Sequence, residues 1–360
     1  MKFQAFKKKK NHIYLNDNLD KQVNEMYPTN NFKNQNQLIL IWLIFIFVLV
    51  IVMIVIGGIT RITDSGLSMV EYKPFLGFLP PLNDLEWNRV FNLYKNTPEY
   101  SYYNRGMILS DFKFIFFWEY FHRLWGRLIG IFFVIPFIYF LVTKKLNKFV
   151  TFKLLTILIL GCLQAIIGWW MVKSGLVDKP DVSQYRLALH FGNSLLILFL
   201  IYWLILDLKN VKSEIKFNFN LLLFFVIFIT IIAGSFVAGM DAGLMYNTYP
   251  LMNDNFLPDD YLSLGILDPF ENPGSAQFHH RHLGLISVLA IIIFFIKNYS
   301  NKKVFLSLIF LMLLIVIQFV LGIYILLNYV PNLNASLHQI GAILIFLTIV
   351  NIIHTLNIKT

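Results

Sequence analysis

The chain alternates between long apolar blocks and shorter polar segments. Eight apolar stretches stand out, each near the length of about 20 residues that a helix needs to cross about 30 Å of hydrocarbon. The stretches are 38–59, 116–142, 152–172, 187–207, 219–239, 280–297, 304–327 and 336–356. This pattern predicts an all-α membrane protein with eight transmembrane helices.

The composition supports this class and excludes others. Hydrophobic residues make up 57% of the chain and charged residues 14%, too few to cover a soluble fold of 360 residues. The net charge of +10 comes largely from lysines at the N-terminus and in short loops, which argues for a topology signal and against nucleic-acid binding. The single cysteine, Cys162, excludes an intramolecular disulfide and a cysteine-ligated metal cluster.

Lysines also predict the direction of the helices. They occupy the polar residues 1–36 and the segments after the second, fourth and sixth apolar stretches. By the positive-inside rule this side is cytoplasmic, so both termini are expected inside. The long loops, about 60–115 and 240–279, then lie outside. Their prolines and aromatic residues indicate loops that cover a site, although an interfacial aromatic belt has the same composition.

The two halves of the chain repeat four short motifs in the same order. The repeated pairs are Asp64-Ser-Gly-Leu with Asp241-Ala-Gly-Leu, Glu119-x-x-His-Arg with Gln277-x-x-His-Arg, Gln164-x-x-x-Gly168 with Gln318-x-x-x-Gly322, and Leu189-His190 with Leu337-His338. Four helices followed by four in the same orientation predict two four-helix bundles related by a pseudo-twofold axis along the membrane normal. The expected parts are a cytoplasmic tail, 1–36, and two halves, 37–207 and 208–360.

One pair of histidines in each half is expected at the same depth, near the outer ends of the spans. The pairs are His122 with His190 and His280 with His338. Two imidazoles from facing helices can ligate one haem iron from opposite sides, so the pattern predicts two haem pockets near the outer surface. A histidine that only bonds a neighbouring helix is the alternative for any single position, whereas zinc would need three or four converging ligands.

The remaining histidines carry less information. His279 lies next to His280, and alignment with His122 favours His280, although spacing alone does not decide between them. His354, near the cytoplasmic end of the last stretch, is assigned no role.

Arginines and one carboxylate accompany the first pair. Arg123 and Arg281 follow two of the histidines, and Arg127 lies one turn beyond Arg123. A guanidinium can pair with a haem propionate, or it can instead extend to lipid headgroups. Arg61 is a weaker candidate for the same role.

Glu119 breaks the symmetry of the halves, because its counterpart is the neutral Gln277. It lies three residues before His122, on the same helix face. A carboxylate there can accept protons or stabilise positive charge, or it can cap the helix or pair with an arginine. The difference suggests that the N-terminal pocket reacts while the C-terminal pocket holds an electron carrier.

In combination these motifs resemble the haem A synthase family over all eight spans. The resemblance rests on Glu119-Tyr-Phe-His-Arg, on Gly57-Gly-Ile-Thr-Arg61 with Asp64-Ser-Gly-Leu-Ser, on Gln277-Phe-x-His-Arg, on Asp241-Ala-Gly-Leu with Tyr249-Pro-Leu-Met, and on His190 and His338. Some members carry cysteine pairs in the outer loops. This chain has none there, so it resembles the cysteine-free branch of proteobacterial and mitochondrial type.

The resemblance implies an inner-membrane oxidoreductase that converts the C8 methyl of haem O to a formyl group by successive hydroxylation, giving haem A for terminal oxidases. It implies haem B held by His280 and His338. Haem O would be bracketed by His122 and His190, with help from Glu119. Haem O would come from the upstream farnesyl-transfer enzyme, the electron acceptor is unidentified, and a homo-oligomer is compatible. A dihaem cytochrome that only passes electrons, or a transporter of haem or a small molecule, are the competing hypotheses.

Overall fold

The computed structural model describes residues 29–71, 77–176, 180–209, 213 and 219–358. The chain divides into two compact units, Met1–Phe45 and Ile46–Thr360, and the packing described below concerns the second. In the first unit, the described part is the beginning of one long helix. Most of the expected tail, 1–36, lies outside the described residues.

Eight of the described helices are long and apolar enough to cross a membrane, so the chain is a multi-pass membrane protein and the eight expected spans are confirmed. In the first of them the spanning part begins at Gln37. The helices are α2 (Thr29–Ile62), α5 (Leu109–Val142), α6 (Lys148–Gly175), α7 (Gln184–Lys209), α8 (Phe219–Gly239), α10 (Pro273–Asn298), α11 (Phe305–Leu327) and α12 (Asn332–Leu356).

Several of these helices begin earlier than their apolar runs, among them α5 and α10. Helix α5 begins at Leu109 and α10 at Pro273, whereas apolarity alone predicts starts near 116 and 280. The side chain of Asn272 accepts a hydrogen bond from the Ser275 N–H and caps α10. The added turns carry polar residues on one side but bury others, as Phe112 shows, so the helix continues where the apolar run has ended.

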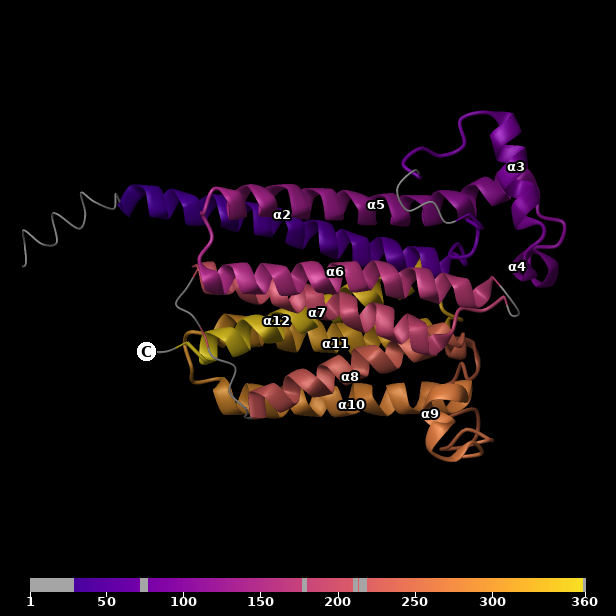
Figure 1. The fold of residues 1–360 in the computed structure, drawn as a ribbon. Helices are drawn as coiled ribbons and strands as arrows, with labels where there is room; N and C mark the ends of the chain where they lie inside the picture. The colour runs from indigo at the N-terminus through magenta and orange to yellow at the C-terminus, as the bar shows by residue number, and fades with distance from the viewer. Residues whose placement is uncertain (1–28, 72–76, 177–179, 210–212, 214–218, 359–360) are drawn as a thin grey trace, which may run out of the picture. The chain divides into compact units, whose positions relative to one another are not determined.

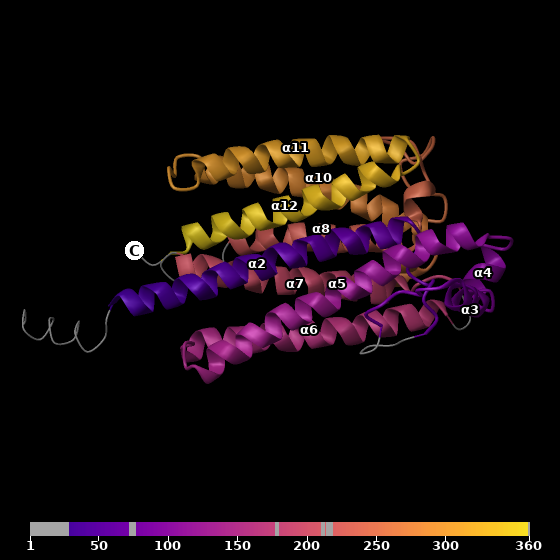
Figure 2. The same cartoon turned by 90° about the horizontal axis from the view of Figure 1, so that it is seen from above.

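The long loops fold into short helices at one end of the spanning helices. The first contains α3 (Asp84–Tyr94) and α4 (Pro98–Tyr102), and the second contains η1 (Ala242–Leu244), η2 (Gly265–Leu267) and α9 (Asp268–Glu271). Figure 1 shows α3, α4 and α9 at the end opposite the C-terminus, and Figure 2 shows α3 and α4 at that end from a second direction. We call this the outer end, and the opposite one the inner end. The described parts of both loops therefore contain helices and share one end.

Two kinds of helix contact recur in the two halves. Helix α6 packs along α7 as α11 packs along α12, and α5 contacts α6 as α10 contacts α11. Helices α7, α8 and α12 pack against one another and join the halves. The sequence repeat is therefore accompanied by a repeat in packing, while the pseudo-twofold axis stays a prediction.

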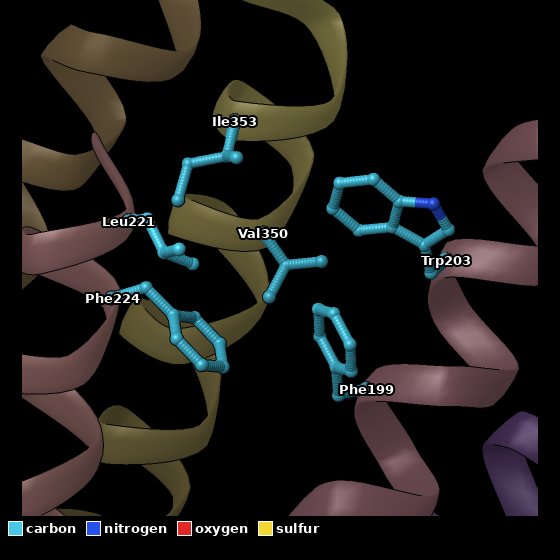
Figure 3. A pocket seen from close by; sticks show the side chains of 6 residues that line it. All are labelled: Phe199, Trp203, Leu221, Phe224, Val350 and Ile353. Carbon is cyan, nitrogen blue, oxygen red and sulfur yellow. The ribbon is translucent and has the colours of Figure 1, made fainter. Parts of the chain in front are cut away.

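A small cavity lies where α7, α8 and α12 meet. Its volume is about 20 Å³, and its lining is apolar: Phe199, Trp203, Leu221, Phe224, Val350 and Ile353 (Figure 3). A space of this size holds about one water, but a water needs polar partners. We regard it as a dry packing void and not as a ligand site.

Candidate functional site

Each of the four expected ligand histidines packs its ring against a glycine of another helix. A Cβ atom placed on the glycine would lie 2.9–3.3 Å from the ring, which is tighter than ordinary side-chain contacts. The pairs are Gly57 with His122, Gly168 with His190, Gly234 with His280, and Gly322 with His338. Each of these glycines therefore provides the space that an imidazole occupies.

The repeated Gln-x-x-x-Gly motif explains how two of these histidines are held. The Nε2 atom of Gln164 donates to the backbone carbonyl of His190 at 3.0 Å, and that of Gln318 donates to the carbonyl of His338 at 2.9 Å. In each motif the glutamine binds the histidine backbone, and the glycine four residues later admits the ring.

The structure brings the histidines together in the expected pairs. His122 and His190 lie within range of direct electrostatic interaction, and so do His280 and His338. All four side chains are partly accessible. Among the described residues, the Nδ1 atoms of His190, His280 and His338 are buried without a hydrogen-bond partner.

These features fit a metalloporphyrin better than a bare metal ion. Within the described ranges, no group of three or more His, Cys, Asp or Glu side chains is placed to hold a metal ion. A porphyrin supplies four of its own nitrogen ligands and needs only one or two from the protein. Two imidazoles in a partly accessible site meet that need.

Glu119 is fully buried and both of its carboxylate oxygens are occupied. Its Oε2 atom accepts from the Ser68 hydroxyl and the Met69 N–H, both at 2.7 Å, and its Oε1 atom accepts from Arg123 at 2.5 Å. The carboxylate therefore anchors the segment after α2 and forms a buried ion pair one turn from His122.

Gln277 occupies the equivalent place in the second half. Its Nε2 atom donates to the Tyr246 carbonyl at 3.1 Å, and its Oε1 atom accepts from Arg281 at 3.2 Å. The hydrogen-bonding arrangement resembles that of Glu119, but Gln277 carries no charge. A carboxylate accepts from a backbone N–H in one half, and an amide donates to a carbonyl in the other.

The two arginines that follow the histidines bind the outer segments. Arg123 donates to the Met69 carbonyl at 3.3 Å, and Arg281 donates to the equivalent Tyr246 carbonyl at 2.7 Å. Arg281 also reaches the carbonyls of Thr248 and Leu251. These contacts give both arginines a positioning role, and a role toward propionates stays a prediction.

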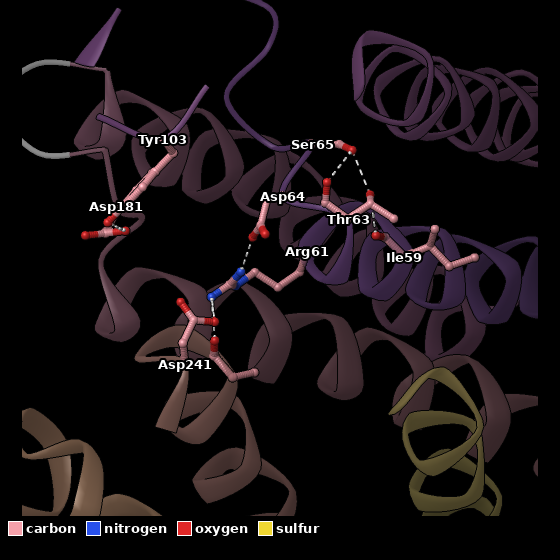
Figure 4. Close-up of polar contacts among 9 residues, drawn as sticks. Ile59, Arg61, Thr63, Asp64, Ser65, Tyr103, Asp181 and Asp241 are labelled. Carbon is pink, nitrogen blue, oxygen red and sulfur yellow. Dashed lines mark hydrogen bonds and ion pairs between the residues drawn. The ribbon is translucent and has the colours of Figure 1, made fainter. Parts of the chain in front are cut away.

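The other two arginine candidates have different surroundings. The Arg127 guanidinium lies 5.6 Å from the centre of the Phe78 ring. Arg61 lies between Asp64 at 2.8 Å and Asp241 at 2.7 Å, and it donates to the Ala238 carbonyl at 2.6 Å (Figure 4). Arg61 therefore links the end of α2 to the end of α8, across the two halves.

His279 and His282 face the outer loop instead of a facing helix. His279 lies near the rings of Tyr261 and Phe278, and the Nδ1 atom of His282 lies 2.8 Å from the Phe278 carbonyl. His280 alone of the three contacts Gly234 as His122 contacts Gly57. The geometry therefore favours His280 as the ligand.

Sequence reasoning missed a buried ion-pair network at the inner end. The Asp207 carboxylate lies 3.0 Å from Nε2 of His354 and 2.7 Å from Nζ of Lys153. His354 is fully buried and packs edge-on against Trp203. The signal was an acidic residue inside an expected span, which usually marks a named partner.

Fold and site together define a polytopic helical membrane protein whose paired imidazoles suit a metalloporphyrin. Residues 40–350 match the model of the COX15-CtaA family of cytochrome oxidase assembly proteins, and the chain belongs to that family.

Relatives of known name agree with this assignment. Proteins named heme A synthase from Nitrosospira multiformis and Pelagibacter ubique are both 43% identical to the chain, over 319 and 299 residues. These alignments cover 84% and 81% of this chain and 89% and 88% of the relatives. A third, from Wolbachia pipientis wMel, is 42% identical over 81% of this chain and 85% of its own length.

Proposed function

We propose that the chain is a haem A synthase, which oxidises the C8 methyl of haem O to a formyl group and so supplies haem A to terminal oxidases. Family membership and the names of the relatives support this. The observation that carries it is the paired histidines of each half, with a buried carboxylate beside only one pair. An electron carrier has no need of that difference.

The two halves would have different roles, one as the cofactor site and the other as the substrate site. His280 and His338 would hold haem B, which when bound supplies a redox centre for electron transfer. His122 and His190 would bracket the substrate, haem O. The Gln318 and Gln164 bonds to the histidine backbones would fix the direction of one ring in each pair.

Glu119 and Arg123 would supply the electrostatics of the reactive half. Arg123 and two hydrogen bonds hold the Glu119 carboxylate in place as an anion. A fixed negative charge one turn from His122 stabilises positive charge that develops as the substrate methyl is oxidised. If one of the groups that donate to the Glu119 carboxylate moves away, the carboxylate can also accept a proton.

The reaction would proceed by two hydroxylations of the methyl carbon, each of which replaces one hydrogen with a hydroxyl group from water and releases two electrons and two protons. The resulting gem-diol loses water to give the formyl group. The electrons leave for an acceptor outside this chain, and haem O arrives from the farnesyl-transfer enzyme. We place the chain in the cell inner membrane with both termini cytoplasmic and the histidine pairs near the periplasmic side. The lysines between α5 and α6 and between α10 and α11, which lie at the inner end, support this direction.

Haem analysis of histidine variants tests the division. In cells that make haem O, His122→Ala or His190→Ala should abolish haem A while the purified protein keeps haem B. His280→Ala or His338→Ala should lose haem B. Chromatography of extracted haems and absorption spectra of the purified protein give both readings. Equal loss of haem B from both sets would contradict the proposal.

The second candidate is a dihaem cytochrome without substrate chemistry, which paired histidines alone would also permit. It predicts haem B in both halves and no haem A in any strain that makes haem O. The same chromatography therefore separates the two functions.

A further inference from the structure

A cavity of about 210 Å³ lies at the outer end of the N-terminal half. Its lining includes Met69 from the segment after α2, Arg123 of α5, Trp169, Val172 and Lys173 of α6, and Leu176 directly after that helix. The Lys173 ammonium lies 5.4 Å from the centre of the Trp169 ring. Two cations therefore border an otherwise largely apolar space.

The cavity adjoins the histidine pair. Gly168 and Val172 are spaced by four residues on α6, so they share one helix face, and Leu176 follows four residues later as the C-cap of that helix. The ring of His190 contacts Gly168, and the cavity begins one turn farther out, at Val172. Arg123 directly follows His122 in α5. A planar group held between the two imidazoles would point one edge into this space.

The C-terminal half differs at the positions equivalent to Lys173 and Val70. The repeat aligns Lys173 with Leu327, so the cation is replaced by an apolar side chain. It aligns Val70 with Asn247, whose amide donates to the carbonyl of Leu326 on α11 at 2.8 Å. That bond ties the outer segment to the helix. Val70, which lines the cavity, has no side-chain amide that could form the equivalent hydrogen bond.

We propose that this cavity binds the carboxylates of the porphyrin held by His122 and His190, with Lys173 as their principal cation. The proposal rests on the proposed function. A porphyrin carries its carboxylates on one edge, and cations at the outer end of the reactive half would select the orientation in which that edge faces outward. An open, charged edge suits a substrate that must enter and leave, whereas the bonded C-terminal half suits a resident cofactor.

Titration with zinc protoporphyrin and with its dimethyl ester tests the inference. The full-length protein with haem B bound is titrated in detergent, and porphyrin fluorescence reports binding. Lys173→Gln should weaken binding of the diacid by roughly fivefold and leave binding of the ester unchanged, the size expected for a partly exposed ion pair. Lys173→Arg should retain the affinity.

Arg186→Gln is the matched control, because Arg186 lies in the same half but donates to the Trp170 carbonyl and stacks on that ring. It should bind the diacid as the wild type does. Equal weakening of diacid and ester, or equal weakening by both variants, would overturn the inference alone. A wild-type protein that binds no porphyrin beyond haem B would overturn the proposed function and the inference with it.

Discussion

Glu99 places a carboxyl group inside the outer helices, away from water. It is 5% exposed, and its Oε2 atom is buried without a hydrogen-bond partner among the described residues. Burial raises the pKa of the Glu99 carboxyl to about 8; a hydrogen bond with Tyr94 opposes this shift, and the charges of Glu119, Asp64 and Asp181 add to it. The group is therefore neutral in the folded protein at neutral pH.

This shift predicts that the outer helices loosen as pH rises. The pKa of Glu99 is higher in the folded state than its ordinary value of 4.5, so its contribution to stability is complete below that value and is lost as pH rises toward 8. Hydrogen exchange of α3 and α4, corrected for intrinsic rates, should be faster near pH 8 than near pH 5.

Glu99→Gln should remove this dependence, whereas Glu86→Gln should retain it because the half-buried Glu86 of α3 pairs with Arg89 and its side chain keeps 43% exposure to water. Exchange with the same pH dependence in wild type and Glu99→Gln would contradict the assignment.

Glu119→Gln copies into the first half the residue that the second half carries. We expect haem A formation to fall by roughly tenfold or more, because the fixed charge near the substrate is lost, while haem B content stays constant. Ser68→Ala removes one hydrogen bond to Oε2 but leaves the charge, so its effect should be much smaller. Equal losses in the two variants would show that Glu119 acts only as an anchor.

Sequence reasoning at this scale identified side chains but not their partners. The four histidines and the Glu119–Gln277 difference could be selected because the repeat aligns them. The packing of each histidine on a glycine could not be predicted, although Gly168 and Gly322 belong to the repeated Gln-x-x-x-Gly motif. A glycine's role depends on what approaches it from another helix, and spacing along the chain does not contain that distance.

At the scale of elements, the spanning helices were predictable because the bilayer sets their length. Their outer ends were not, since α5 and α10 continue through polar turns that pack on the ordered loops. Helices α3 and α4 also escaped prediction. Their stability depends on a buried hydrophobic cluster that α3 and α5 form together and against which Tyr100 of α4 packs: Phe91, Tyr94, Phe112, Ile115 and Phe116.

Glycine substitutions test how the helices position the histidines. The Cβ of Gly234→Ala would lie 3.0 Å from Cε1 of His280, so the ring must move and haem B should be lost or its absorption spectrum shifted. Gly284→Ala in α10 is the control, because no atom lies within 4 Å of its added methyl. It should keep the wild-type spectrum. Identical spectra for both variants would mean that the ring does not depend on Gly234.

At the scale of the whole molecule, the repeat predicts two similar halves but not the contacts that join them. The described residues show an ion-pair link near each end. At the outer end Arg61 of the first half binds Asp241 of the second, and at the inner end Asp207 of the first half binds His354 of the second. Asp241 is repeated as Asp64, but Arg61, Asp207 and His354 are not repeated in kind at their aligned positions, so the motif comparison could not find these links.

The two links differ in burial, and burial decides which one matters for stability. The side chain of Asp241 is 66% exposed, so water and salt screen its pair with Arg61 and its loss should cost under about 1 kcal/mol. The side chain of Asp207 is 3% exposed. Asp207→Asn removes the charge that pairs with partly buried Lys153 and replaces the acceptor beside buried His354. This change should cost about 3 kcal/mol, with Lys153 relieved in part by reaching toward water.

Thermal unfolding of the purified variants, followed by circular dichroism, compares the two links directly. We expect Asp207→Asn to lower the midpoint clearly more than Asp241→Asn. Adding Lys153→Met to Asp207→Asn should recover part of the loss, because it removes a cation that no longer has its carboxylate. Equal midpoints for the two single variants would show that the inner network contributes no more than an exposed pair, and that packing of α7, α8 and α12 alone joins the halves.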